Sequence, residues 1–279
     1  RDHTTQKNIL WATDNYKDMG KMYSFMEEIK SEYITGEYGY IIMPRVRKDT
    51  ELQQLRVREM AEVFTPSWIC NAQNNLIDNA WFGRDNVFNK EVTTPEGVNT
   101  WLTNSEKITF PKGKTWRHYI RDTRLEMTCG EAPYLTSRYD TTTGNFIPVE
   151  ERIGLLDRKL RVINENINVS GEWLKAVQIA YKSIYGFEWQ GDSLLLAREA
   201  LLITFIENYT LKFGKEPMLK SIKYIAYIIS WNLWQMDGLK GVIPNSCGRI
   251  TTTKTDLFGY ETTLSNFCRG CMEDNIKRH

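Results

Sequence analysis

The sequence has little of what most common enzyme signatures require. Of its 279 residues only three are histidine, five are cysteine and eight are proline, and no two prolines are adjacent. It contains no G-x-S-x-G, no G-x-x-x-x-G-K-[ST] and no H-E-x-x-H, which disfavours ordinary serine hydrolases, P-loop nucleotide hydrolases and zinc proteases. No apolar run approaches the roughly 18 to 20 residues of a membrane span, and we expect no signal peptide.

The sequence also lacks an excess of charge of either sign. The chain has 36 Lys+Arg against 35 Asp+Glu, a net charge of +1 and 41% hydrophobic residues, as expected of an ordinary globular protein. A neutral total neither supports nor excludes nucleic acid, because a binding surface can be local. Few cysteines in an odd number are typical of a reducing compartment, so we expect free thiols and a cytoplasmic location without membrane attachment.

Helical patterns begin with two segments in the first third of the chain. We expect a short helix over 17–31 within an otherwise irregular stretch. A clearer helix follows Thr65, which is a natural N-cap, with Pro66 at the first helical position. Its buried face is predicted by apolar residues at helical spacing, namely Ile69, Ala72, Leu76 and Ala80.

The remaining pattern alternates strands and helices. After a connector over 83–113, expected as loops or an edge hairpin, short strands are predicted over 124–128, 185–189 and 231–236. Helices are predicted over 151–164, 172–184, 194–209 and 218–230. Such alternation favours an α/β fold with a parallel sheet.

An acid closes each predicted strand or the turn after it. These acids are Glu126, Glu188 and Asp237. Ligands of open α/β sheets bind at the carboxyl ends of the strands, and Gly130 in the first of these turns lets the backbone approach a ligand closely. Asp237 has a simpler alternative, which is to cap its own turn at Gly238.

In this order the segments resemble class I S-adenosylmethionine-dependent DNA adenine-N6 methyltransferases of restriction-modification systems, in their gamma arrangement. The resemblance rests on Phe64-Thr65-Pro66, Leu125-Glu126-Met127-Thr128-Cys129-Gly130-Glu131-Ala132, Gly186-Phe187-Glu188-Trp189 with Leu196-Ala197-Arg198, and Asn232-Leu233 with Asp237-Gly238-Leu239. It implies a Rossmann-like methyltransferase core with a mostly helical N-terminal region, and S-adenosylmethionine as cofactor.

The resemblance also implies the cofactor contacts. Glu126 and the turn of Cys129, Gly130, Glu131 and Ala132 would bind the amino-acid end of the cofactor. Glu188, followed by Trp189, would bind the ribose, and Asp237, followed by Gly238, would bind the adenine ring. Phe64, Thr65 and Pro66 would cover the site.

Two departures from the family pattern shape the expectation. Met127 stands where the family often has proline, and Ala132 replaces a glycine, which weakens the claim of cofactor affinity. The catalytic [DNS]-P-P-[YF] motif is missing, so no catalytic residue is assigned in this chain. We therefore expect a cofactor-binding part, inactive alone, whose adenine clamp and DNA-reading region lie past residue 279. The implied partners are DNA and a restriction or specificity subunit in a bacterial cell.

The corresponding domain division has three parts. Residues 1–60 form an N-terminal helical or loop extension, 61–246 an incomplete S-adenosylmethionine-binding core, and 247–279 a cysteine-containing insertion or the start of a further segment. Two other functions stay open: a methyltransferase acting on RNA or on a protein glutamine, and a non-catalytic DNA-binding or scaffold subunit with a degenerate cofactor pocket.

Two further groups of residues have simple interpretations. Cys247, Cys268 and Cys271 with His279 show only half of a zinc-site spacing, so free thiols are favoured and no metal site is assigned. Cys129 is interpreted as a small packing residue, because no histidine is placed to activate it. The tryptophans at helical spacing are expected in the core rather than in a base-stacking site; they are Trp68, Trp81, Trp231 and Trp234.

Overall fold

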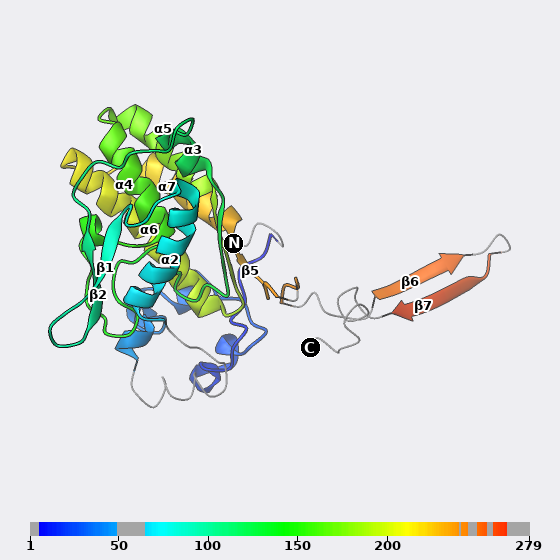
Figure 1. Cartoon of the computed structure of the whole chain (residues 1–279). Coiled ribbons are helices and arrows are strands. Elements are labelled where there is room, and N and C mark those ends of the chain that lie inside the picture. The colour runs from blue at the N-terminus through cyan, green and yellow to red at the C-terminus, as the bar shows by residue number, and fades with distance from the viewer. Residues whose placement is uncertain (1–5, 49–64, 240, 245–249, 256–258, 267–279) are drawn as a thin grey trace.

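A computed structural model describes residues 6–48, 65–239, 241–244, 250–255 and 259–266 (Figure 1). At its centre lies a parallel sheet of three strands in the order β3 (Arg124–Met127), β4 (Ile184–Glu188), β5 (Leu233–Gln235). In this register Leu125 pairs with Tyr185, and Phe187 pairs with Trp234. The three predicted strands and the α/β class are confirmed, in a form compatible with a Rossmann-like fold.

Two pairs of helices connect the strands. Helices α4 (Leu155–Asn166) and α5 (Ser170–Lys182) lie between β3 and β4, and α6 (Gly191–Phe213) and α7 (Leu219–Asn232) lie between β4 and β5. All four confirm predicted helices. Both crossovers run in the same direction along the sheet, and because such crossovers are right-handed their helices cover the same face.

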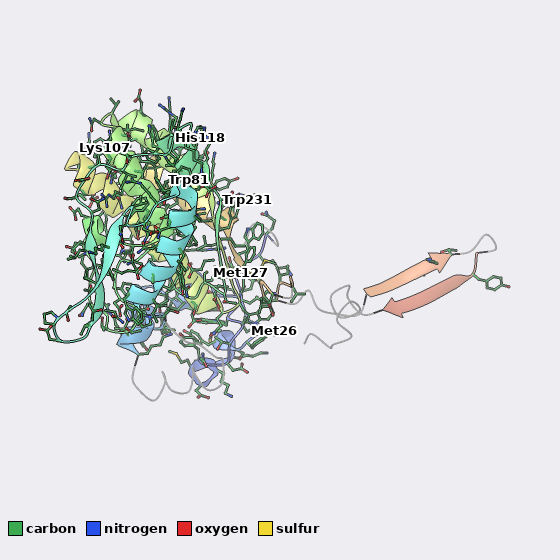
Figure 2. All side chains as sticks on the ribbon, viewed as in Figure 1. Met26, Trp81, Lys107, His118, Met127 and Trp231 are labelled. Carbon is green, nitrogen blue, oxygen red and sulfur yellow. The ribbon has the colours of Figure 1, made fainter. Side chains whose placement is uncertain are left out.

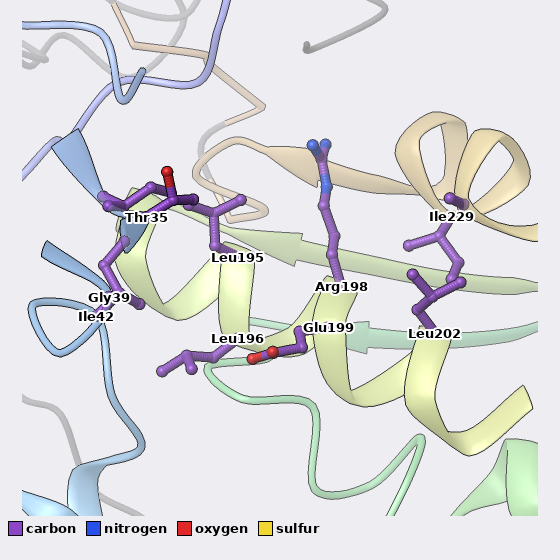
Figure 3. Close-up of a pocket in the computed structure, with 11 residues that line it drawn as sticks. Thr35, Gly39, Ile42, Leu195, Leu196, Arg198, Glu199, Leu202 and Ile229 are labelled. Atoms are coloured by element: carbon purple, nitrogen blue, oxygen red, sulfur yellow. The ribbon is translucent and has the colours of Figure 1, made fainter. Parts of the chain in front are cut away.

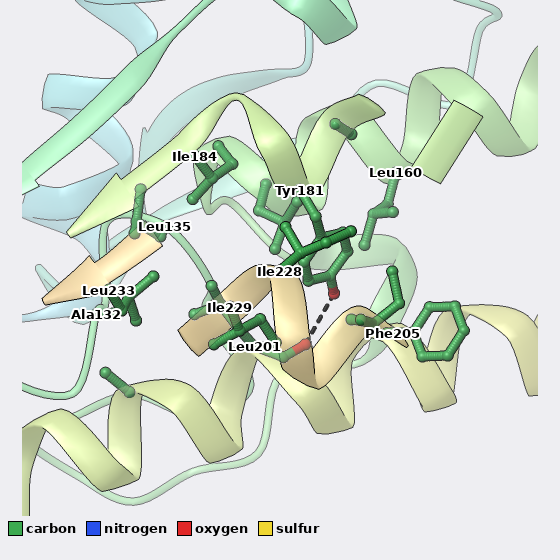
Figure 4. Close-up of a cluster of buried hydrophobic side chains, with 14 of the residues drawn as sticks. Ala132, Leu135, Leu160, Tyr181, Ile184, Leu201, Phe205, Ile228, Ile229 and Leu233 are labelled. Atoms are coloured by element: carbon green, nitrogen blue, oxygen red, sulfur yellow. Dashed lines mark hydrogen bonds between the residues drawn. The ribbon is translucent and has the colours of Figure 1, made fainter. Parts of the chain in front are cut away.

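The main core lies between this face and the helices (Figure 4). Ile184 and Leu233 point from the sheet into a cluster of Leu160, Leu201, Phe205 and Ile229. Within the cluster Tyr181 donates its hydroxyl proton to the carbonyl oxygen of Leu201 at 2.8 Å, which satisfies the one polar atom of that ring.

The opposite face of the sheet is partly open to solvent. Leu125 is 47% and Met127 42% exposed, and Phe187 and Trp234 stack face to face at 5.6 Å between ring centroids. Side chains alternate along each strand, so the buried set on one face and this half-exposed set on the other follow directly from the strand period.

The described residues form several smaller elements besides the sheet and its four helices. The connector contains an antiparallel hairpin, β1 (Asn89–Thr93) and β2 (Asn99–Thr103), as one of its two predicted forms; the short helix α3 (Trp116–Arg121) then leads into β3. A 3-10 turn, η6 (Val149–Glu151), precedes α4, and β6 (Ile250–Thr255) pairs antiparallel with β7 (Glu261–Asn266).

Helix α2 (Ser67–Phe82) exists, but its predicted buried face is wrong. Leu76 is 70% exposed, whereas the buried positions are mostly polar and include Asn71, Asn74, Asn75 and Asp78. Its predicted start is wrong too: Pro66 is the cap residue without a side-chain bond, and the backbone N–H of Ser67 donates to the Asp140 carboxylate at 2.8 Å.

A buried ion-pair network explains the polar face of α2. Asp78 pairs with Arg158 of α4 at 2.7 Å, and both side chains are 1% exposed. The same guanidinium donates to the side-chain oxygens of Asn71 and Asn75, and the Tyr119 hydroxyl donates to Asp78. A buried guanidinium needs hydrogen-bond acceptors, so the face of α2 that packs against Arg158 carries side-chain oxygens rather than apolar groups.

The helix predicted over 17–31 is not formed. That region contains 3-10 turns, namely η1 (Lys17–Met19), η2 (Lys21–Tyr23), η3 (Ser31–Tyr33), η4 (Gly36–Tyr38) and, further on, η5 (Arg45–Arg47). The backbone instead pairs across: the N–H groups of Trp11 and Ala12 donate to the carbonyls of Glu27 and Phe25. Pairing with a distant segment thus replaces local helical bonds.

The predicted placement of the tryptophans is wrong in part. Trp68 is 39% and Trp231 42% exposed, whereas the fully buried tryptophans are Trp11 and Trp173. No helix among the described residues has the length and apolar character that a bilayer span requires.

Candidate functional site

The loop after β3 has an alternating backbone conformation. Thr128, Gly130 and Ala132 adopt positive φ angles of 52°, 54° and 61°. Glycine takes this conformation freely, but threonine and alanine do so at a cost of about 1 kcal/mol or more, so the surrounding contacts hold the loop in place. A Cβ built on Gly130 would meet no atom within 4 Å, so the backbone of the loop is approachable there.

Glu188, at the end of β4, fastens this loop. Its Oε2 accepts the backbone N–H of Gly130 at 2.7 Å, and its Oε1 accepts that of Gln190 at 2.9 Å. Burial raises the pKa of this carboxyl, and the negative charge of Asp192 adds to the rise, while the two amide donors oppose it. The predicted loop and the predicted ribose acid are therefore in direct contact.

Glu126 faces the protein rather than the open side of the loop. Its two carboxylate oxygens accept the backbone N–H groups of Leu135 at 3.1 Å and Tyr134 at 3.4 Å. Burial raises the pKa of this carboxyl well above its usual value, and Glu188 contributes to the rise. In this geometry Glu126 fixes the chain that follows the loop.

Three further residues of the loop are buried, namely Cys129, Glu131 and Ala132. Cys129 is 2% exposed and lies 3.2 Å from where a Cβ of Gly186 would be, so it packs closely against β4 as predicted. Ala132 is fully buried, and the Glu131 carboxylate accepts the hydroxyl proton of Tyr139.

The third predicted segment turns back at the end of β5. Asp237 Oδ1 accepts the N–H of Leu239 at 3.0 Å, which is the turn-capping role that the sequence left open for it. Gly238 lies against the sheet, since a Cβ there would come within 3.0 Å of the Phe187 ring and 3.5 Å of Met127. The turn therefore reaches the ends of β3 and β4.

The start of α2 lies beside the segment that follows the loop. The carbonyl oxygen of Thr65 accepts the Thr141 hydroxyl at 3.0 Å and the Cys70 thiol at 3.6 Å. Asp140 supports this contact: burial opposes ionisation, but hydrogen bonds from Thr142 and Ser67 lower the pKa of its carboxyl. Phe64 lies outside the described residues.

The N-terminal segment around Leu10 and Trp11 forms one wall of the site, and the sequence did not predict it. The backbone N–H and carbonyl of Leu10 bond reciprocally to the Gln235 side chain, both at 2.8 Å, and Gln235 also donates to the carbonyl of Trp189 at 2.9 Å. The N–H of Gly191 donates to the carbonyl of Trp11. The N-terminal segment therefore crosses the carboxyl ends of β4 and β5; its only sequence signal is the short apolar run Ile9-Leu10-Trp11-Ala12.

The same wall contains a buried acid. Asp192, fully buried in the first turn of α6, accepts the Tyr16 hydroxyl at 2.7 Å and the Lys48 ammonium at 3.5 Å. The partners come from residues more than a hundred positions away, so sequence spacing gave no sign of this contact.

A separate pocket of about 450 Å³ lies beside α6 (Figure 3). Its lining is mainly aliphatic and comes from the N-terminal region, α6 and α7, including Ile42, Leu195 and Ile229. Arg198 is one of its few polar residues, and its guanidinium donates to the carbonyl of Leu233, so it ties α6 to β5. None of the predicted cofactor residues lines this pocket.

Within the described part of the chain, no three His, Cys, Asp or Glu side chains are grouped as a metal site would need. Cys247, Cys268, Cys271 and His279 lie outside the described residues. No known protein family, curated protein or solved structure matches the chain.

Proposed function

We propose that the chain is the S-adenosylmethionine-binding part of a DNA adenine methyltransferase of a restriction-modification system. One observation carries the proposal: the three segments that resemble the family's cofactor motifs meet at the carboxyl edge of one parallel sheet. The Gly130 to Glu188 hydrogen bond joins two of them, and the contact of Gly238 with Phe187 brings in the third.

The loop has room for a ligand beside its backbone. Gly130 offers open space where a side chain would stand, and two of its neighbours are held in the same left-handed conformation. A loop held in this way presents its backbone to a ligand without further ordering, which lowers the cost of binding. The residues assigned to the amino-acid end of the cofactor are the turn from Cys129 to Ala132.

The electrostatics of the edge favour a cation. Glu126 and Glu188 are both buried. Burial raises the pKa of each carboxyl, and a nearby acid adds to the rise: Glu188 for Glu126, and Asp192 for Glu188. A positively charged ligand relieves this repulsion, and the cofactor supplies an activated methyl group on a sulfonium centre. Glu126 acts here as a positioning residue, while Glu188 borders the assigned ribose position.

Methyl transfer to an adenine amine needs mainly alignment of the amine with the methyl group. The clamp that holds a flipped adenine in the family is absent from this sequence, which has no adjacent prolines. The proposal therefore assigns cofactor binding to these residues and no catalytic group. DNA and a restriction or specificity subunit are the proposed partners.

Calorimetric titration of the chain with S-adenosylmethionine tests the proposal. We expect saturable heat at micromolar to millimolar ligand, lost in the Gly130→Val variant, whose branched side chain fills the approach to the loop in a conformation that valine disfavours. Gly214→Val is the matched control, because Gly214 has a φ of 66° and equally open surroundings at the end of α6.

No heat with the unaltered chain at millimolar ligand would reject the cofactor assignment. Equal loss in both variants would show a general folding defect, which thermal unfolding measures independently. NAD⁺ and ATP in parallel titrations distinguish the cofactor from other ligands that carry adenosine.

A further inference from the structure

Basic charge is concentrated on one helical layer, although the whole chain is nearly neutral. Helices α3, α5 and α7 pack side by side, and their exposed ionised residues are six Lys or Arg and one Glu. The basic residues are Arg117, Arg121, Lys175, Lys182, Lys220 and Lys223, and the acid is Glu172. This ratio contrasts with 36 to 35 for the chain, so the layer forms a local positive surface.

An open groove of about 510 Å³ runs between α5 and α7 within this surface. Its lining contains two lysines, two tyrosines and two neutral polar residues, and no acid: Gln178, Lys220, Ser221, Lys223, Tyr224 and Tyr227. Lys182 adds a third ammonium, 5.8 Å from the centre of the Tyr224 ring.

The aromatic rings at this groove are exposed rather than packed in the core. Tyr224 is 40%, Tyr227 51% and Trp231 42% exposed. Their ring centroids follow one another along α7 at 6.4 and 6.3 Å, and the two tyrosines are within 23° of parallel. Figure 2 labels Trp231, one of these three rings.

We propose that the groove between α5 and α7 binds single-stranded nucleic acid. The lysine ammonium groups of a lining that contains no acid attract phosphates, and the exposed rings beside them offer stacking surfaces for unpaired bases. An acidic protein would pair with the lysines, but its charge alone gives no role to the row of exposed rings. A duplex hides its base faces, so the row of rings favours a single strand. This surface is distinct from the carboxyl edge of the sheet and does not rest on methyl transfer.

Fluorescence anisotropy with labelled oligo(dT) and oligo(U) of about 12 nucleotides tests the proposal. We expect saturable binding of one or both, weakened at least tenfold by Tyr224→Leu with Tyr227→Leu. Lys220→Gln with Lys223→Gln is expected to lower the slope of log K against log salt by about 1.4, since each phosphate contact on a single strand contributes about 0.7.

Matched variants on other surfaces separate the groove from general effects. Lys90→Gln with Lys107→Gln removes the same charge from β1 and from the loop after β2, and Trp68→Leu removes an exposed ring from α2. Both are expected to leave affinity within about twofold, and thermal unfolding checks that every variant folds.

Three results would overturn the proposal: no binding of either oligonucleotide, equal weakening by the matched variants, or tighter binding of a duplex of equal length with no effect of the tyrosine changes. The third result would mean that the groove contacts phosphates only and that bases do not stack on the tyrosines. A failed titration with S-adenosylmethionine leaves this proposal unchanged, and a failed anisotropy experiment leaves the cofactor proposal unchanged, because the two surfaces share no residue.

Discussion

The backbone amide of Gly130 donates to the Glu188 carboxylate at 2.7 Å, which joins the loop after β3 to the end of β4. The second oxygen of the same carboxylate accepts the amide of Gln190 just before α6. One side chain thus satisfies an amide of the loop assigned to the cofactor and an amide just before α6. Its removal changes loop geometry as well as charge, which makes it a sensitive position for testing the site.

Glu188→Gln is expected to weaken S-adenosylmethionine binding at least tenfold and to lower the free energy of unfolding by about 1 to 3 kcal/mol. The amide NH₂ of glutamine is a donor and cannot accept a hydrogen bond, so one of the two backbone N–H groups loses its buried partner. Titration calorimetry and urea unfolding measure the two effects. Glu172→Gln, an exposed change on α5, serves as the control. Unchanged affinity in Glu188→Gln would remove Glu188 from the proposed site.

Gly191→Ala is expected to destabilise the protein by more than about 2 kcal/mol, because the added Cβ would lie 2.0 Å from the carbonyl oxygen of Leu10 and 2.7 Å from Ile29. The backbone of the N-terminal segment cannot yield without breaking its bonds to Gln235. Gly171→Ala on α5 is the matched control, since nothing lies within 4 Å of that Cβ. It is expected to stabilise by about 0.5 to 1 kcal/mol. Urea unfolding of both variants checks the contrast, and equal effects would contradict the close packing of the N-terminal wall.

The sheet and its four helices could be predicted because their signals are local. Short runs such as Ile184 to Glu188 are flanked by long segments with helical period, and the strand period then decides which residues face the core. The acids at strand ends were located by the same logic. Their partners were not, since the amides that Glu126 accepts belong to Tyr134 and Leu135 in a loop without periodicity.

The errors have a common physical origin in long-range polar contacts. In α2 the apolar pattern pointed to Leu76, but the buried Arg158 guanidinium selects Asn71, Asn75 and Asp78 for the inner face. In the N-terminal region, backbone pairing of Trp11 with Glu27 replaces the expected helix. Such contacts join residues that are distant in sequence, so no local window contains the information.

The thiols of Cys70 and Cys129 are expected to resist alkylation in the folded protein. Burial raises the pKa of Cys70 to about 12 and that of Cys129 well above its usual value, and the two side chains are 0% and 2% exposed. Only the thiolate reacts, so iodoacetamide at pH 8 should label both in urea and neither under native conditions. Peptide mapping by mass spectrometry reads each cysteine separately. Native labelling of Cys129 at the rate of a free thiol would show that the loop opens readily.

Lys159 is expected to make stability depend on pH in the neutral to alkaline range. Its side chain is fully buried, and its ammonium donates to the Ser183 hydroxyl at 2.5 Å and to the carbonyl of Ile120 at 3.4 Å. Burial lowers the pKa of this lysine from 10.5 to about 7, and the charge of Arg124 adds to the effect. Between these two values the unfolded chain binds a proton that the folded chain does not. The free energy of unfolding therefore rises with pH, by at most about 1.4 kcal/mol per unit for this group.

Lys159→Met removes this dependence while keeping much of the buried volume. We take the unfolding free energy of the unaltered protein minus that of Lys159→Met. This difference is expected to rise as the pH increases from 7 to about 9.5, because only the unaltered protein gains stability over that range. Below pH 7 both states of the unaltered protein bind the proton, so the difference should level off there. Urea unfolding at several pH values measures it, and Lys90→Met, on the exposed side of β1, accounts for the loss of a surface charge. A difference that stays constant from pH 7 to 9.5 would mean that the buried ammonium keeps its ordinary pKa, because its hydrogen bonds to oxygen acceptors stabilise the charged form.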